Sequence, residues 1–325
     1  MRVDAKNLAF RSRLAIFHVS RASSTRYTIS SMPELPDVEV YIEVIERRIA
    51  GERLTGIRLG NPFVLRSVSP APAELAGREV VGVRRLGKRI VFELEGEHYI
   101  VVHLMVAGRF RWLAPGAKLP GKLGLAAFDF PAGTLALTEA GSKRRASIHL
   151  LRGEEALATM DPGGIDVMAA GVEAFGAALT RERHTLKRTL TDPKVFSGIG
   201  NAYSDEILHR ARLSPVQLTT NLSADEVARL HQATRDTLAE WTDRLRRETG
   251  DGFPEKVKAF HPEMAVHGRY GQPCPVCGAP VQRIRYAENE TNYCARCQTG
   301  GRLLADRAMS RLLKGDWPRS IDELG

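Results

Sequence analysis

The triplet Met32-Pro33-Glu34 could carry out nucleophilic chemistry if it stood at the start of a polypeptide. Removal of the methionine would leave Pro33 with a free secondary amine and the carboxyl group of Glu34 directly beside it. An α-amino group has a pKa of about 7.7–8.0, so an appreciable fraction is neutral and nucleophilic at cellular pH. Inside a chain, the same two residues are ordinary at the start of a helix. Both interpretations place Pro33 and Glu34 at a helix N-terminus.

Four cysteines form a second chemical pattern, C-x2-C-x16-C-x2-C. Two such pairs supply four thiolates, the tetrahedral set that Zn²⁺ favours, and leave no open position for catalysis. We therefore predict one structural zinc ion. No cysteine remains for a disulfide, which fits a reducing compartment. The predicted ligands are Cys274, Cys277, Cys294 and Cys297.

A third pattern lies in residues 185–215, where two glycines separate two expected helices. The first helix contains Lys187, Gly198 and Gly200 allow a tight double turn, and Asn201 precedes the second helix. Turns that lead into a helix start can present backbone N–H groups to a phosphate. By itself, this pattern fits an ordinary helical hairpin equally well.

Regular elements must position these groups. Apolar residues recur at helical spacing behind Pro33, and Gly51 supplies a stop signal, so the sequence predicts one amphipathic helix. Residues 53–151 contain β-rich segments punctuated by glycine, at the spacing of an antiparallel sandwich. The apolar positions of the helix are Val38, Tyr41, Ile42, Ile45 and Ile49.

The second half of the chain reads as helical beyond a linker at residues 160–166. Ser223 and Glu226 form a capping box, and the helix behind them runs towards Gly250. The segment VQRIRY between the cysteine pairs fits a β-hairpin, and a short helical tail follows. The sequence thus predicts an α+β fold.

Composition suggests two domains and a polyanionic partner. A chain of 325 residues is too long to fold around one compact hydrophobic core. No apolar run reaches the length that a membrane span requires. The formal net charge is +9, but residues 1–31 hold six basic side chains and one acidic one, a net of +5. We expect residues 1–31 to be an extension that is removed, or that arises from a start codon assigned too far upstream.

Four segments in order resemble the Fpg/Nei family of bifunctional DNA glycosylases (formamidopyrimidine-DNA glycosylase and endonuclease VIII-like proteins). They are MPELPDVE, GIGNAYSDEIL with LSP behind it, VHGRYGQPCPVCG and YCARCQ, and they span Met32 to Cys297. The resemblance implies a catalytic β-sandwich at 32–155, a helix–two-turn–helix domain at 165–262, a zinc finger at 266–300 and a helical tail at 301–325.

The resemblance also implies an enzyme of DNA base-excision repair, both glycosylase and AP lyase. In this family the initiator Met is removed, and the amine of the Pro33 position attacks C1′ of a damaged, usually oxidised, nucleotide. A secondary amine yields a permanently cationic iminium, which drives strand cleavage by β-elimination. Glu34 would be the general acid/base, and Lys88 would contact phosphate and assist elimination. Asn289 replaces the usual finger-tip Arg, which leaves δ-elimination open.

By the same resemblance, Lys187 and Asn201 match DNA-contacting positions. Arg145 lies in a basic run that could grip phosphate, and Arg296 could replace the missing finger-tip Arg; both could equally be solvated surface residues. The family fills the gap left by a flipped base with loop side chains. Met105 or Val106 could act as that wedge, although apolar residues in a strand are more often core.

The expected partner is double-stranded DNA with damaged bases or abasic sites, bound by a monomer without membrane attachment. We expect a cytoplasmic, nucleoid-associated location, with organelle targeting by residues 1–31 as the alternative. Two other functions fit the same motifs. One is a non-catalytic zinc-finger DNA-binding protein, and the other is a family member that acts on atypical lesions such as crosslinks.

Overall fold

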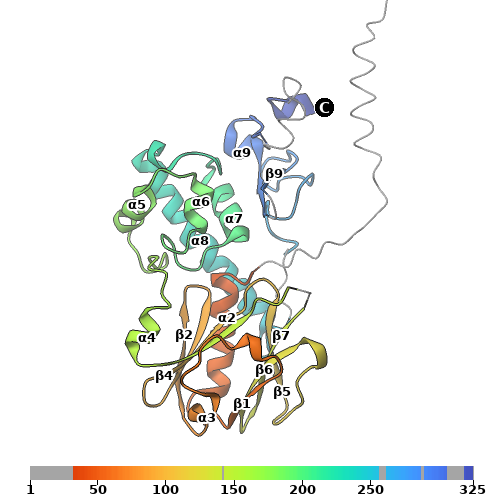
Figure 1. Ribbon diagram of the computed structural model, residues 1–325. Coiled ribbons are helices and arrows are strands. Elements are labelled where there is room, and N and C mark those ends of the chain that lie inside the picture. The colour runs from red at the N-terminus through yellow and green to blue at the C-terminus, as the bar shows by residue number, and fades with distance from the viewer. Residues whose placement is uncertain (1–31, 141–142, 256–260, 287–288, 306–317, 325) are drawn as a thin grey trace, which may run out of the picture.

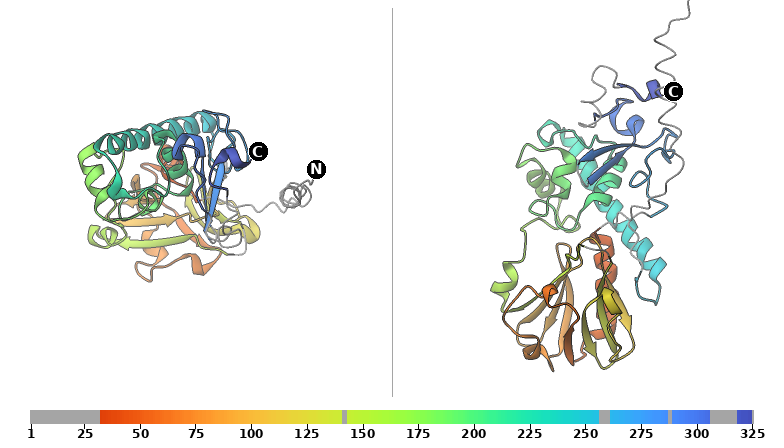
Figure 2. Two further views of the ribbon diagram at one scale, coloured as in Figure 1. Left: turned by 90° about the horizontal axis from the view of Figure 1, so that it is seen from above. Right: turned by 45° about the vertical axis from the view of Figure 1, so that its right-hand side comes forward.

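The computed structural model describes residues 32–140, 143–255, 261–286, 289–305 and 318–324. Residues 1–31 and most of the expected tail helix lie outside the described residues. The described chain forms a β-sandwich at one end of the molecule, with a group of helices and a small cysteine-containing module at the other (Figure 1). The turned views in Figure 2 show the same arrangement. The predicted α+β class is confirmed.

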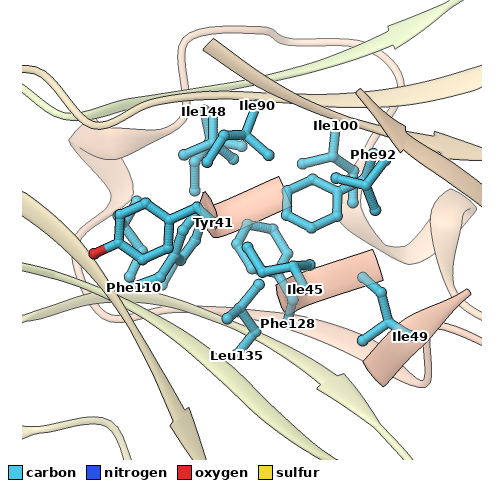
Figure 3. Close-up of a cluster of buried hydrophobic side chains, with 14 of the residues drawn as sticks. Tyr41, Ile45, Ile49, Ile90, Phe92, Ile100, Phe110, Phe128, Leu135 and Ile148 are labelled. Atoms are coloured by element: carbon cyan, nitrogen blue, oxygen red, sulfur yellow. The ribbon is translucent and has the colours of Figure 1, made fainter. Parts of the chain in front are cut away.

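The first described helix, α2 (Leu35–Ile49), is the predicted amphipathic helix behind Pro33-Glu34. It ends shortly before Gly51, whose φ of +76° is a conformation that glycine adopts without a Cβ clash. All five predicted apolar positions are buried. Figure 3 shows the α2 side chains Tyr41, Ile45 and Ile49 in the core between the sheets. Aromatic residues of both sheets surround them, Phe92 of one sheet and Phe110 and Phe128 of the other.

Two four-stranded antiparallel sheets form the sandwich. One has the order β2-β3-β4-β8 and contains β2 (Val80–Leu86), β3 (Arg89–Leu94), β4 (His98–His103) and β8 (Ser147–Arg152). The other has the order β1-β6-β7-β5 and contains β1 (Gly56–Leu59), β6 (Gly124–Phe130), β7 (Gly133–Glu139) and β5 (Gly108–Leu113). The connections include the short turns η1 (Pro62–Val64), α3 (Pro72–Leu75) and η2 (Gly121–Leu123).

The helical part follows α4 (Glu154–Ala158) and the expected linker. It contains α5 (Val172–Thr180), α6 (Leu186–Thr191), α7 (Asn201–Ala211), the turn η3 (Thr219–Asn221) and α8 (Ala224–Thr249). The predicted capping box is present: the Glu226 N–H donates to Ser223 Oγ (3.2 Å), and the Ser223 N–H donates to Glu226 Oε2 (3.0 Å). It starts α8 at the predicted place.

The cysteine module contains the predicted hairpin, β9 (Gln282–Tyr286) paired antiparallel with β10 (Asn289–Tyr293). The helix α9 (Ala295–Thr299) and the turn η5 (Ile321–Leu324) complete it. Its small core is separate from the cores of the sandwich and of the helical part. Residues from before, within and after the hairpin form it: Val266, Val281, Ile284, Tyr293, Leu303, Leu304 and Ile321.

The sandwich and the helical part are joined through α2. Leu35 is buried in the core of the helical part, whereas the five predicted apolar positions of α2 are buried in the core of the sandwich. The Leu35 N–H donates to the Gly198 carbonyl (3.0 Å). Arg85 of β2 adds hydrogen bonds to Ser197 Oγ (3.0 Å) and Asp166 Oδ2 (2.7 Å). Among the described residues, no helix is long and apolar enough to cross a membrane.

Candidate functional site

The Glu34 carboxylate lies at the N-terminus of α7. Its Oε2 accepts the backbone N–H groups of Gly200 (2.6 Å) and Tyr203 (3.2 Å), and its Oε1 accepts that of Ala202 (2.8 Å). The first N–H groups of a helix have no acceptor within the helix, and the helix dipole favours an anion at this end. The residue is only 2% exposed. The interaction fixes the carboxylate and attaches the start of α2 to α7.

Lys88 approaches the same point from the turn between β2 and β3. A Cβ added to Gly200 would lie 2.4 Å from Lys88 Nζ and 2.4 Å from Glu34 Cδ. The ammonium and the carboxylate therefore both pack against this glycine, and the close approach requires the missing side chain. Burial lowers the pKa of Lys88, the positive charge of Lys187 lowers it further, and the negative charge of Glu34 opposes both.

Pro33 is buried and precedes α2. The residues on either side of it, Met32 and Glu34, line a cavity of about 30 Å³, together with Asp37 and Trp241. This volume has room for about two water molecules. The Asp37 carboxylate accepts the Glu34 backbone N–H at 2.9 Å. Burial raises the pKa of Asp37 to about 7, so a titratable group lies one turn from the expected nucleophile.

Lys187 of α6 is paired inside the protein. Its Nζ donates to Asp205 Oδ1 (2.6 Å) and to the Asn201 carbonyl (2.6 Å), and its side chain is 13% exposed. The other oxygen of Asp205 accepts His267 Nδ1 (2.8 Å) and the Asn292 N–H (3.1 Å). Because Asp205 is fully buried, its ion pair with Lys187 is strong. Lys187, which we expected to contact DNA, is thus held by a partner inside the protein.

Asn201 contacts the cysteine module directly. Its Nδ2 donates to the backbone carbonyl of Glu290 in β10, at 2.9 Å. The double turn before it matches the prediction: Gly198 has a φ of +87°, and Gly200 is the residue before α7. The N-terminus of α7 thus touches both Glu34 of the sandwich side and the β9–β10 hairpin.

The four cysteine sulfurs lie within 4.8 Å of one another. Cys274 and Cys297 sulfurs are 3.9 Å apart, and Cys277 and Cys294 sulfurs are 3.4 Å apart. Tetrahedral coordination with Zn–S bonds of about 2.3 Å requires sulfur separations of about 3.8 Å. The four residues therefore fit one zinc ion.

Of the remaining predicted residues, the two arginines lie on the surface. Arg145 is exposed, and its backbone N–H is held by the Glu139 carboxylate (2.9 and 3.0 Å). Arg296 of α9 is 56% exposed and contacts Asp322 Oδ1 (3.2 Å). Met105 and Val106 lie in the turn after β4 and not within a strand, and Met105 has a φ of +53°. Both are partly buried.

Sequence reasoning missed Asp205, Glu206 and His267. Glu206 is buried and accepts three backbone N–H groups in the segment before the cysteines, those of Ala265, Val266 and His267 (2.7, 2.9 and 2.9 Å). The signal in the sequence was the adjacent pair Asp205-Glu206 directly before the apolar pair Ile207-Leu208. The structure shows that this helix is buried at nearly all of its positions. Buried carboxylates need several donors, so such residues mark a junction with another segment.

Family comparisons agree with this architecture. The model of the formamidopyrimidine-DNA glycosylase N-terminal domain matches residues 32–154, and that of its H2TH domain matches residues 164–246. A zinc finger found in FPG and IleRS matches residues 271–300. With the sulfur geometry, this match makes the four cysteines a site for one zinc ion.

Individual relatives span most of the chain. The formamidopyrimidine-DNA glycosylase of Variovorax paradoxus is 33% identical over 276 residues, covering 82% of this chain and 100% of the relative. That of Thermus thermophilus is 34% identical over 284 residues, covering 83% and 100%. The crystal structure of the Thermus protein has a TM-score of 0.69 at 31% identity, covering 82% of this chain and 98% of that one.

A complex of Lactococcus lactis Fpg, non-covalently bound to DNA that contains an AP site, has a TM-score of 0.72 at 25% identity. It covers 82% of this chain and 99% of the Lactococcus chain. The protein belongs to the formamidopyrimidine-DNA glycosylase (Fpg) family, as the ordered sequence segments predicted.

Proposed function

We propose that this protein is a base-excision repair glycosylase with AP-lyase activity, acting on damaged bases in double-stranded DNA. The Pro33 nitrogen attacks C1′ of the damaged nucleotide, the C1′–base bond breaks, and the nitrogen gives up its proton to the departing base. Protonation of O4′, which we assign to Glu34, then breaks the C1′–O4′ bond, so that the sugar ring opens and an iminium forms. Loss of a proton from C2′ then breaks the C3′–O bond, which is β-elimination. Hydrolysis of the iminium returns the free amine. The monomer would work in the cytoplasm, on the nucleoid.

The active form must begin at Pro33. While Met32 precedes it, the Pro33 nitrogen is an amide and has no nucleophilic lone pair. We therefore infer that residues 1–32 are absent from the working enzyme, either because translation starts at Met32 and that residue is removed or because the segment is cleaved. Intact-mass measurement of the protein isolated from its own cells tests this directly.

The observation that carries the proposal is the position of the Glu34 carboxylate. It is adjacent to Pro33, held by three N–H groups of α7, and faces Lys88 across Gly200. A fixed carboxylate suits proton transfer to the sugar, and an amine with a lowered pKa suits removal or delivery of a proton. The solved relative bound to abasic-site DNA supports DNA as the partner.

DNA contacts are assigned by the same proposal to Asn201, Lys187, Arg145 and Arg296, and the stack wedge to Met105 or Val106. Lys187 contributes less to direct DNA contact than we expected, because it already forms an ion pair with Asp205. Arg145 and Arg296 have exposed side chains that can reach phosphate.

Borohydride trapping tests the catalytic step. Protein that starts at Met32 is incubated with DNA containing one abasic site and reduced with borohydride, and peptide mass mapping locates the adduct. We expect a covalent adduct on Pro33, and none with the 325-residue chain that retains residues 1–32. DNA binding without an adduct, from protein shown to begin at Pro33, would leave the non-catalytic DNA-binding function.

A panel of oxidised purines, formamidopyrimidines, oxidised pyrimidines and crosslinks in duplex DNA identifies the substrate class. We expect release of an oxidised base to be fastest. Faster turnover of a crosslink would favour the atypical-lesion alternative.

A further inference from the structure

Polar residues at four-residue spacing mark one face of α7. The three contact the zinc-binding part of the chain in succession: Asn201 reaches Glu290, Asp205 reaches Asn292, and His209 reaches Cys274. Residues four apart lie above one another on a helix, so these contacts form one row along α7. The first two bind the hairpin, whereas the third binds a zinc ligand.

His209 lies beside the zinc ligand Cys274. Its Nε2 is 3.3 Å from Cys274 Sγ, a hydrogen-bond distance for a sulfur acceptor, and the residue is 6% exposed. A zinc-bound cysteine is a thiolate, which accepts hydrogen bonds and cannot donate them. Nε2 must therefore carry the proton and donate it towards the sulfur. The aromatic ring has no other role in the proposed DNA chemistry.

A second contact ties the other cysteine pair to the end of the same helix. Gln298 is buried; its Oε1 accepts the Cys294 N–H (2.8 Å), and its Nε2 donates to the Leu213 carbonyl (2.9 Å). Leu213 follows α7 by two residues. Both halves of the zinc site are thus attached to the C-terminal end of α7, whose N-terminal end holds Glu34.

We propose that His209 is a positioning residue for the zinc site, orienting the Cys274 thiolate through an Nε2–H···S hydrogen bond. Such a bond spreads the negative charge of the thiolate and fixes the direction of its lone pairs towards the metal. Residues that orient metal ligands in this way commonly change metal affinity by about 10- to 100-fold. The role goes beyond the proposed enzymatic function and does not depend on it.

Zinc release provides the first test, with the intact zinc-loaded protein and a chromogenic chelator. We expect His209→Ala to lose zinc at least about tenfold faster than the unmodified protein. His209→Gln, which keeps an N–H donor in a similar place, should recover most of the difference. The matched control is His231→Ala, because His231 is also a buried helical histidine but bonds to the Ala170 carbonyl (2.9 Å).

The proposal is overturned if His209→Ala releases zinc no faster than His231→Ala. A second measurement needs no substitution, which covers the case in which His209→Ala fails to fold. In protein loaded with ¹¹³Cd, NMR should show the His209 Nε2–H proton with a scalar coupling to the metal through the Cys274 sulfur. A His209 that carries its proton on Nδ1, or an Nε2–H without that coupling, would rule the hydrogen bond out.

Discussion

Glu34 and Gly200 are joined by a 2.6 Å hydrogen bond across 166 positions of sequence. This bond fixes the Glu34 carboxylate at the first N–H groups of α7. Glu34 directly follows Pro33, the expected nucleophile. Because a Cβ at Gly200 would also meet Lys88, one glycine sets the spacing of both charged groups. The contact holds the sandwich and the helical part together at the candidate active site.

Gly200→Ala should disrupt this arrangement. The added methyl would lie 2.4 Å from both Glu34 Cδ and Lys88 Nζ, so both side chains, or the backbone at Gly200, must move. We expect the free energy of unfolding to fall by about 1–3 kcal/mol and borohydride trapping to fall with it. Gly171→Ala is the matched control, since Gly171 also precedes a helix and nothing lies within 4 Å of its Cβ position. Equal stability of the two variants in urea would contradict the expectation.

Lys187→Ala should destabilise the protein before it affects DNA binding. It removes the ion pair to Asp205, which is fully buried, and leaves a carboxylate with reduced compensation. We expect a loss of about 3 kcal/mol, and a partial recovery in Lys187→Ala with Asp205→Asn. Urea unfolding of the two single variants and the double variant measures the coupling. A wild-type stability for Lys187→Ala, with weaker DNA binding, would instead favour a direct phosphate contact.

Asp37 should make stability depend on pH. Burial raises the pKa of Asp37 to about 7 from an ordinary 3.8, so the folded protein binds more protons than the unfolded chain between these values. This contribution to the free energy of unfolding is complete below about pH 4 and is lost as the pH rises through about 7. Asp37→Asn should therefore gain stability relative to wild type between about pH 5 and about pH 8, by roughly 3 kcal/mol. If the free energies of unfolding of wild type and Asp37→Asn, measured in urea, depend on pH in the same way, the pKa of Asp37 is not raised.

Arg145→Ala and Arg296→Ala should each flatten the salt dependence of DNA binding. Each phosphate contact contributes about 0.9 to the slope of log K against log salt, so either loss should reduce it by about one. Affinity should fall for all duplex sequences alike. Arg53→Ala is the control, as Arg53 is an exposed arginine that precedes β1. Fluorescence anisotropy over a range of salt concentrations measures DNA binding by the three variants. If the slope for Arg145→Ala or Arg296→Ala equals that of wild type, the substituted arginine does not contact phosphate.

The sequence alone determined the local elements and the family. Helical spacing predicted α2, the Ser223–Glu226 pair predicted the start of α8, and the cysteine spacing predicted one zinc site, because each depends on residues of one short segment. The sequence leaves Met105 and Val106 open between a wedge in a loop and core residues in a strand. The structure puts both in the turn that connects β4 to β5, strands of different sheets, because apolarity alone does not show where the chain leaves one sheet for the other.

The tertiary structure decided which groups meet. The resemblance implied that Lys187 contacts DNA, whereas its partner in the structure, Asp205, is 18 residues away on another helix. The sequence assigned no role to His209, whose partner Cys274 lies 65 positions further on. Periodicity reports which face of an element is buried, but not what lies against that face. The partners of Glu34, Lys187 and His209 follow from the packing of distant segments, and only the folded chain specifies them.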